Sequence, residues 1–335
     1  MSRLIYLMDE IALTLWLQAN PALQGVMRAL SFLGQQEFFL AMLPVLFVFA
    51  SPRQAIRISV FLLVQHAINA TAKLGAHSPR PYWVDPRVTA GATETSYGLP
   101  SGHAQTAAIW LYAASVLHWR WLWPLAIALP ILIGLSRVYL GVHFAGDVLG
   151  GWLLGLAVLA LYLAFEARVV AWLKRQTFTA HLLLGALVAA VILLAGILTQ
   201  AAVAGSADPA GWAQYAGHAR DLDDFFTASG ALFGLLAGAA LAHRAGFDLG
   251  ATPPTRRLRR LLLAVAGSLV LWLGLKQIFP TQPEALGHAL RWVRYALTTL
   301  WVSYGVLRVE GGTLTEDGGT LTEDGRPRTE GGSHG

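Results

Sequence analysis

Three short groups of polar residues stand at the ends of apolar stretches and could carry out chemistry together. They are Lys73 with Arg80-Pro81, then Pro100-Ser101-Gly102-His103, then Ser136-Arg137 with His143 and Asp147. The groups supply three cations, two histidines and one carboxylate. Three positive charges around one pocket repel each other unless an anion of about two charges neutralises them, as a phosphate monoester does. The set therefore predicts a phosphate site that includes no metal.

In the third group, His143 and Asp147 lie four residues apart at the expected start of a helix, and hence on one helical face. The carboxylate can accept a hydrogen bond from one imidazole nitrogen, which leaves the other nitrogen unprotonated. A nucleophilic or basic histidine needs this arrangement. A purely structural pair and half of a metal site are the alternatives, and the absence of a further ligand at metal spacing disfavours the second.

The second group predicts the start of a helix. Ser101 is a natural N-cap, and Gly102 lets a ligand approach the backbone. The free N–H groups of a first helical turn attract an anion, and His103 would point into that anion site. By itself, the tetrapeptide is also typical of an ordinary helix start.

The first group closes a predicted helix. Lys73 shares a face of that helix with Asn69, and a polar face inside a membrane bundle usually lines a cavity. A lysine near a helix end can instead extend into the lipid headgroups.

The elements that must position these groups are predicted to be membrane helices. Of the 335 residues, 55 % are hydrophobic and only 13 % are charged, whereas about 25 % of a soluble globular protein is charged. The 12 Trp and 34 Gly suit interfacial belts and closely packed membrane helices. We therefore predict an all-α, polytopic membrane bundle. The absence of Cys excludes disulfides and thiolate chemistry.

About nine transmembrane helices are predicted, after an N-terminal interfacial helical segment at residues 1–35 that breaks at Pro21. The spans are expected at 36–50, 54–76, 102–118, 121–136, 144–165, 180–203, 225–243, 261–279 and 289–308. They divide into a five-span core at 36–166, which carries the three polar groups, and a four-span region of unassigned role at 180–308. Residues 309–335 contain the heptamer GGTLTED twice and are expected to be a disordered polar tail.

The formal net charge of +5 comes mainly from Lys and Arg in the short connections between apolar stretches. This distribution fits the anionic headgroups of a lipid bilayer and not a nucleic-acid partner. The basic connections fall on one side of the nine-span arrangement, which the positive-inside rule makes cytoplasmic. The three polar groups would then face the periplasm or exterior of a bacterial inner membrane.

The three groups, in this order, resemble the complete signature of the type 2 phosphatidic acid phosphatase and vanadium haloperoxidase superfamily, in particular its bacterial membrane lipid phosphatases. The resemblance covers residues 30–165. It implies that His143 attacks phosphorus and becomes a phosphohistidine, that Asp147 holds the tautomer of His143, and that His103 protonates the leaving oxygen. It also implies a phosphate-binding set that needs no cofactor, namely Lys73, Arg80, Ser101, Gly102 and Arg137.

We therefore predict an integral membrane phosphatase for a lipid phosphate or diphosphate, such as phosphatidate, phosphatidylglycerol phosphate or undecaprenyl diphosphate. A lipid phosphotransferase would use the same intermediate but pass the phosphate to another lipid. A non-catalytic lipid-phosphate carrier is a further alternative, disfavoured because binding alone needs neither His103 nor an oriented His143. The sequence assigns neither the particular lipid nor an oligomeric state.

Overall fold

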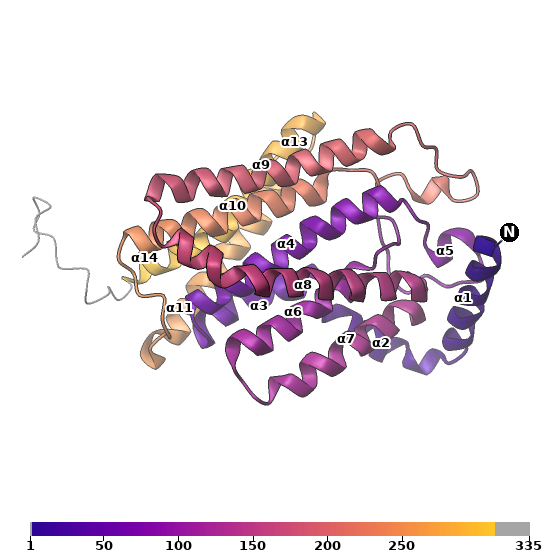
Figure 1. Ribbon diagram of the computed structural model, residues 1–335, viewed down its shortest axis with the longest axis horizontal. Coiled ribbons are helices and arrows are strands. Elements are labelled where there is room, and N and C mark those ends of the chain that lie inside the picture. The colour runs from indigo at the N-terminus through magenta and orange to yellow at the C-terminus, as the bar shows by residue number, and fades with distance from the viewer. Residues whose placement is uncertain (1, 312–335) are drawn as a thin grey trace, which may run out of the picture.

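The computed structural model describes residues 2–311, and within that range the chain is helical, without a β-strand. Figure 1 shows long helices running side by side as a bundle, with α1 (Ser2–Gln18) lying across one end. A 3-10 turn at Pro21–Leu23 and the short α2 (Gln24–Phe32) follow. The N-terminal segment therefore breaks at Pro21 as predicted, because a proline ring fixes φ and removes a backbone donor.

The core of the bundle forms helices close to the expected boundaries. They are α3 (Gln36–Phe49), α4 (Pro52–Ala76), the short α5 (Pro81–Val84), α6 (Gly102–Leu117), α7 (Leu122–Tyr139) and α8 (Ala145–Leu173). The last of these continues past the expected boundary at 166, because the apolar sequence continues as VVAWL up to Leu173.

The C-terminal region begins with α9 (Phe178–Val203) and α10 (Asp223–Arg244). Two longer helices follow, each interrupted by a π-helical segment. The first consists of α11 (Pro254–Leu269), η3 (Val270–Gly274) and α12 (Leu275–Ile278). The second consists of α13 (Glu284–Leu300), η4 (Trp301–Gly305) and α14 (Val306–Glu310).

The predicted start of the tail at residue 309 is wrong, because α14 continues to Glu310. The side chain of Glu310 is buried, and its Oε2 accepts a hydrogen bond from Nε of Arg260 at 2.6 Å. This ion pair holds the last helical turn against α11. The rest of the predicted tail, residues 312–335, lies outside the described residues.

Six helical stretches of the described chain are long and apolar enough to cross a membrane. They are Pro52–Val84, Leu122–Tyr139, Ala145–Leu173, Phe178–Val203, Asp223–Arg244 and Pro254–Ile278. Two of the other expected spans fall on α3 and α6, which are only 14 and 16 residues long. The third falls on the helix formed by α13, η4 and α14, where Arg291, Arg294 and Arg308 interrupt the apolar sequence. A bilayer needs about 20 residues per helix, so the predicted number of nine is not confirmed.

The long helix α4 joins the two halves of the bundle, since it packs against α6 on one side and against α9 and α10 on the other. Glycines allow the closest contacts between helices. A Cβ atom on Gly151 of α8 would lie 2.5 Å from the carbonyl oxygen of Ser101, and one on Gly155 would lie 2.7 Å from that of Gln105. The close helix packing that the glycine content suggested is therefore observed where α8 meets the start of α6.

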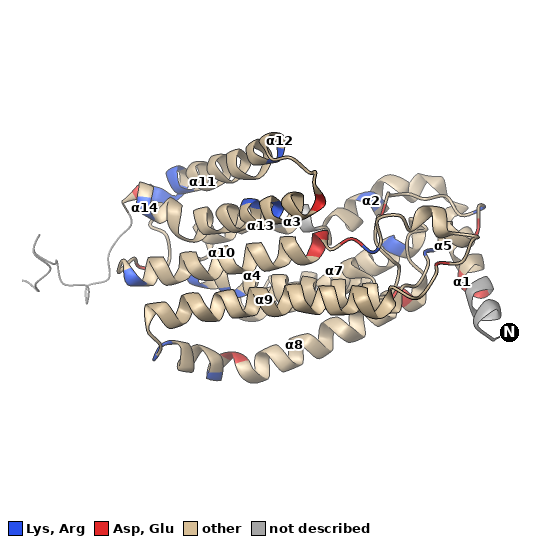
Figure 2. Ribbon diagram, turned by 90° about the horizontal axis from the view of Figure 1, so that it is seen from above, with Lys and Arg blue, Asp and Glu red and all other residues tan. Residues whose placement is uncertain are grey.

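Basic residues gather at one end of the bundle, as Figure 2 shows where α8 meets α9, where α10 ends and where α11 begins. The start of α4 lies at this same end, because the backbone N–H of Arg53 bonds to the carbonyl of Leu249 in the α10–α11 connection (3.1 Å). The other end of α4, which carries Lys73, is therefore remote from the basic end.

Candidate active site

The structure brings the eight residues predicted for the site together at the end of the bundle opposite the basic end. Lys73 lies in the last turn of α4, and Arg80 precedes α5. The α6 start supplies Ser101, Gly102 and His103. The remaining three come from the α7–α8 region, where Arg137 lies in the last turn of α7, His143 stands in the connection and Asp147 lies in the first turn of α8.

His143 is buried between the carboxylate of Asp147 and the guanidinium of Arg80. Its Nδ1 lies 3.4 Å from Oδ2 of Asp147, and its Nε2 lies 3.2 Å from Nη1 of Arg80. A guanidinium nitrogen can only donate, so Nε2 must be the accepting nitrogen and Nδ1 must carry the proton. The same Asp147 oxygen accepts the backbone N–H of Phe144 at 3.0 Å, which fixes the carboxylate. His143 is therefore in the tautomer with its proton on Nδ1, which leaves the lone pair of Nε2 available for nucleophilic attack.

Burial and nearby positive charge both disfavour the imidazolium form of His143. Burial, followed by the charges of Arg80, Lys73 and Arg137, lowers the pKa of His143 well below its usual value. The side chain is only 1 % exposed. His143 is therefore neutral and keeps its lone pair at neutral pH.

Arg80 is fully buried and held by the loop that follows it. Its guanidinium donates to the carbonyl oxygens of Ser96 (2.7 Å), Tyr97 (3.0 Å) and Val142 (2.8 Å). Lys73 is fixed by the same loop, since its Nζ donates to the carbonyl of Tyr97 at 2.7 Å. Both cations are therefore positioned before any ligand arrives.

Arg137 bonds to two residues that the sequence did not single out. Its Nη1 donates to Oγ of Ser31 in α2 at 2.5 Å, and its Nη2 donates to Glu94. Glu94 also lies 3.6 Å from Nη2 of Arg80. The N-terminal segment thus contributes to the site through Ser31.

Glu94 places a carboxylate between two of the predicted phosphate-binding arginines. Burial by itself would raise the pKa of Glu94, but Arg137 and Arg80 outweigh burial and hold this pKa well below its usual range. The loop between the first two motifs contains two acids, Asp85 and Glu94, and spacing alone gives no reason to prefer one. Asp85 instead pairs with Arg87.

The start of α6 has the predicted form. Oγ of Ser101 accepts the backbone N–H of Ala104 at 3.4 Å, so Ser101 is the N-cap. A Cβ atom on Gly102 would lie 3.0 Å from Oδ1 of Asn69, so a larger residue would crowd the cavity side of this turn. Nε2 of His103 is buried and has no hydrogen-bond partner within residues 2–311, which leaves it available to a ligand.

A second set of residues that the sequence did not single out belongs to the connection between α9 and α10. The hydroxyl of Tyr97 donates to Oδ1 of Asp208 at 2.9 Å, and Nε of Arg220 donates to the same hydroxyl at 2.9 Å. Burial, followed by Asp208, raises the pKa of Tyr97 to about 12. No motif marks these residues, because the contact joins positions more than 100 residues apart in sequence.

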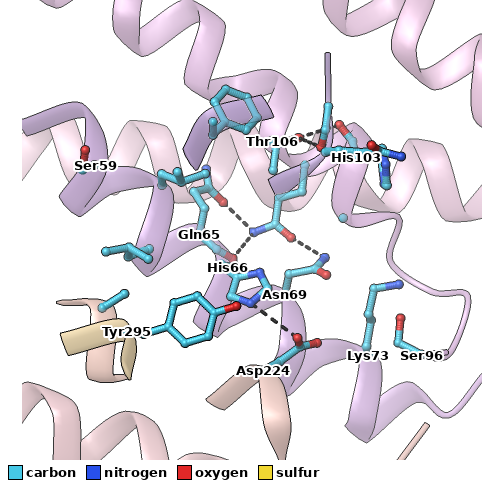
Figure 3. A pocket seen from close by; sticks show the side chains of 18 of the residues that line it. Ser59, Gln65, His66, Asn69, Lys73, Ser96, His103, Thr106, Asp224 and Tyr295 are labelled. Carbon is cyan, nitrogen blue, oxygen red and sulfur yellow. Dashed lines mark hydrogen bonds and ion pairs between the residues drawn. The ribbon is translucent and has the colours of Figure 1, made fainter. Parts of the chain in front are cut away.

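One cavity of about 390 Å³ opens onto this site. Figure 3 shows Lys73, Ser96 and His103 on one side of it, with Asn69 and His66 farther along α4. The lining residues nearest the predicted chemistry are Lys73, Glu94, Ser96, Gly102, His103 and His143. A neutral imidazole, a second histidine and a lysine therefore share one enclosed space.

Comparison with known proteins agrees with this arrangement. Residues 54–171 match the PAP2 superfamily, and residues 226–309 match the transmembrane extension of PAP2 superfamily phosphatases. Fold and matches together define an integral membrane protein with a PAP2 domain and its transmembrane extension. The chain belongs to the PAP2 superfamily. The second match also covers most of the region to which sequence motifs had assigned no role.

Curated relatives include an undecaprenyl-diphosphatase of Sulfolobus acidocaldarius, 33 % identical over 138 residues, which are 40 % of this chain and 66 % of the relative. Phosphatidylglycerophosphatase B of Bacillus subtilis is 29 % identical over 45 % of this chain and 78 % of its own length. Sphingosine-1-phosphate phosphatase 2 of Mus musculus is 30 % identical over 38 % of each chain. The first of these matches thus spans just under two thirds of its relative. No solved structure gave a significant match.

Proposed function

We propose that this protein removes phosphate from a lipid phosphate or diphosphate through a phosphohistidine on His143. The observation that carries the proposal is the contact pair of His143, with Nδ1 on Asp147 and Nε2 on Arg80, at the edge of the cavity. A buried, neutral imidazole with its lone pair directed at a cation is suited to attack an anionic phosphoryl group that the cation binds.

In the first step, Nε2 of His143 attacks phosphorus and the bond from phosphorus to the lipid oxygen breaks. His103 supplies the proton that the departing oxygen takes up, and the free Nε2 of His103 in the cavity supports this role. Asp147 stabilises the positive charge that develops on the His143 ring.

In the second step, water attacks phosphorus of the phosphohistidine. His103 now accepts a proton from that water, the nitrogen–phosphorus bond breaks, and inorganic phosphate leaves. The starting protonation states of both histidines are thereby restored.

The non-bridging oxygens would be held by Lys73, Arg80 and Arg137, assisted by the start of α6 at Ser101 and Gly102. Preorganised cations and backbone N–H groups stabilise the charge of a phosphoryl-transfer transition state without rearranging. The bonds of Lys73 and Arg80 to backbone carbonyls support this role, because they fix both cations in advance.

Phosphate and Glu94 compete for the same two arginines in this mechanism. The carboxylate of Glu94 occupies one edge of the anion site, so a substrate dianion must displace it or share Arg80 and Arg137 with it. Glu94 therefore keeps the arginines partly neutralised between turnovers.

The proposed site faces the periplasm or exterior of a bacterial inner membrane. The concentration of Lys and Arg at the opposite end supports this orientation, because basic residues are retained on the cytoplasmic side. A phosphate headgroup at the outer surface could then reach the cations while its apolar chain stays among the helices.

The test is phosphate release from phosphatidate, phosphatidylglycerol phosphate and an isoprenyl diphosphate in detergent micelles. His143→Ala is expected to abolish release from every substrate the wild type accepts, and vanadate is expected to inhibit the wild type. His243→Ala, at an exposed histidine in the last turn of α10 at the opposite end of the bundle, is the matched control and should retain activity. Full activity in His143→Ala would contradict the nucleophile, and labelled phosphate appearing on a second lipid would identify a transferase.

A further inference from the structure

The cavity at the proposed active site extends well beyond the cations. It continues along α4 from Lys73 to Ser59, a distance of about 21 Å at 1.5 Å per helical residue. Figure 3 shows these two residues at opposite sides of the view. A volume of about 390 Å³ is near the lower end of the range for ligand pockets. The cavity is therefore long and narrow.

Both halves of the chain supply apolar side chains to its walls. These include Phe39, Leu43, Leu62, Ala231 and Leu235. Ala231 and Leu235 belong to α10, within the region that matches the transmembrane extension. The extension therefore closes one side of the same space that reaches His143.

The polar side chains along the cavity are largely bonded to each other. Nδ2 of Asn69 donates to Oε1 of Gln105 at 2.7 Å, and Nε2 of Gln105 donates to the carbonyl of Gln65 at 2.9 Å. Oγ1 of Thr299 in α13 donates to the carbonyl of Ala231 at 2.8 Å. With these bonds made, Asn69, Gln105 and Thr299 do not require a polar ligand, so an apolar occupant leaves them satisfied. Nε2 of His66 has no hydrogen bond within the described residues and lies 3.7 Å from Oδ1 of Asp224.

The α10 wall is also packed closely against α13. A Cβ atom on Gly230 or Gly234 would collide with the backbone carbonyls of Trp292 and Ala296, so α10 and α13 touch along their backbones. Leu235 and Ala231 are buried and line the cavity. A wall packed this closely against α13 limits what fits beside it.

We propose that this cavity binds the hydrocarbon chain of the lipid phosphate, and that Ala231 and Leu235 of the extension determine how long or bulky that chain can be. The proposal rests on the proposed function, because the phosphate must be held at His143 for the chain to extend along α4. Each methylene that enters an apolar cavity strengthens binding. The extension thus acts as a specificity element for the chain and takes no part in the chemistry.

The test compares two substrates with one headgroup, hexadecyl phosphate and butyl phosphate, in full-length protein. Leu235→Trp fills the cavity away from the cations. It is expected to lower kcat/KM for hexadecyl phosphate by about tenfold, since overpacking is costly where a closely packed wall limits relaxation. Hydrolysis of butyl phosphate should change less than about twofold, because a short chain ends before the level of Leu235 on α10.

The matched control is Leu187→Trp, the same substitution on α9 at a side chain that is 59 % exposed on the outer surface of the bundle. It should leave both substrates unaffected. Equal losses for the two substrates in a folded Leu235→Trp protein, or no loss for either, would overturn the proposal.

A measurement on the wild type decides the question if Leu235→Trp does not fold. A hexadecyl phosphonate with a diazirine at its chain end should label peptides of α10 and α3 on irradiation. Label found only on the outer faces of α8 and α9 would overturn the chain site. A wild type that is labelled on α10 but hydrolyses neither phosphate would contradict the proposed function while leaving the chain site intact.

Discussion

The phenol of Tyr97 donates a hydrogen bond to the carboxylate of Asp208, which belongs to the other half of the chain. The carbonyl of the same Tyr97 accepts hydrogen bonds from both Lys73 and Arg80. One residue therefore connects the α9–α10 connection to two proposed phosphate ligands. The loop between α5 and α6 owes part of its shape to a segment that has no motif.

Tyr97→Phe is expected to lower kcat by about tenfold with a smaller change in KM, because a hydrogen bond to a charged group contributes about 1.5–3 kcal/mol and its loss frees the loop. Steady-state kinetics on a lipid phosphate checks this, with Tyr215→Phe at a half-exposed tyrosine as the control. The raised pKa of Tyr97 adds a pH signature. The protonated phenol of Tyr97 stabilises the folded protein fully below about pH 10, and this contribution is lost as the pH rises towards 12. The stability of Tyr97→Phe should not show this loss.

Glu94→Gln is expected to lower the melting temperature and to tighten the binding of inorganic phosphate. Removing the carboxylate leaves Arg80 and Arg137 without their internal anion, at a cost of about 1–3 kcal/mol. Added phosphate or vanadate should restore the melting temperature more in the variant than in the wild type, because ligand binding stabilises the folded state. Thermal unfolding in detergent micelles with and without phosphate measures both effects. Equal responses in the two proteins would contradict competition at the arginines.

The ion pairs of Glu94 also predict that the folded protein loses stability at acid pH. A carboxyl whose pKa is held low in the folded protein stabilises it above the ordinary pKa of about 4.3. That contribution is lost as the pH falls further, and it should be absent from Glu94→Gln. Asp85→Asn, in the same loop but paired with Arg87 at the surface, is the matched control.

The acid limb of the pH–rate profile is expected below pH 6.5, the ordinary pKa of histidine. Because burial and the neighbouring cations lower the pKa of His143, its lone pair persists into mild acid and is lost only when the ring is protonated. The measurement is kcat/KM against pH for two substrates whose phosphate pKa values differ. A limb that is centred above 6.5, or that moves with the substrate, would count against this assignment.

Gly234→Ala is expected to destabilise the protein by about 1–3 kcal/mol, because its methyl group would overlap the carbonyl of Ala296. Gly217→Ala is the control, since no neighbouring atom lies within 4 Å of its added Cβ. Thermal unfolding distinguishes the two. Similar melting temperatures would mean that α10 and α13 can separate without cost.

Most helices could be predicted from the sequence, because membrane helices are long apolar stretches with basic ends. The number of membrane crossings could not, since α3 and α6 are too short to be counted from hydropathy and length alone. The start of the tail was misjudged at Glu310, whose polar side chain looks exposed until Arg260 is found beside it.

The proposed catalytic residues could be named from their order and spacing, because each lies beside a helix end that the sequence marks. Ser31, Glu94 and Asp208 could not, since each meets the site through a contact between distant segments. Such residues have no local pattern, and only the packing of the helices brings them to the arginines or to Tyr97.

Arg80 and Lys73 are anchored mainly to oxygen atoms of the polypeptide backbone and not to side chains. Every amino acid provides a carbonyl, so substitutions at Ser96 or Val142 that respect the local space would leave these backbone anchors in place. The positions of the two cations therefore depend little on which side chains the surrounding loops carry. Substitutions in these loops can change how a substrate enters the site while Lys73 and Arg80 keep their positions.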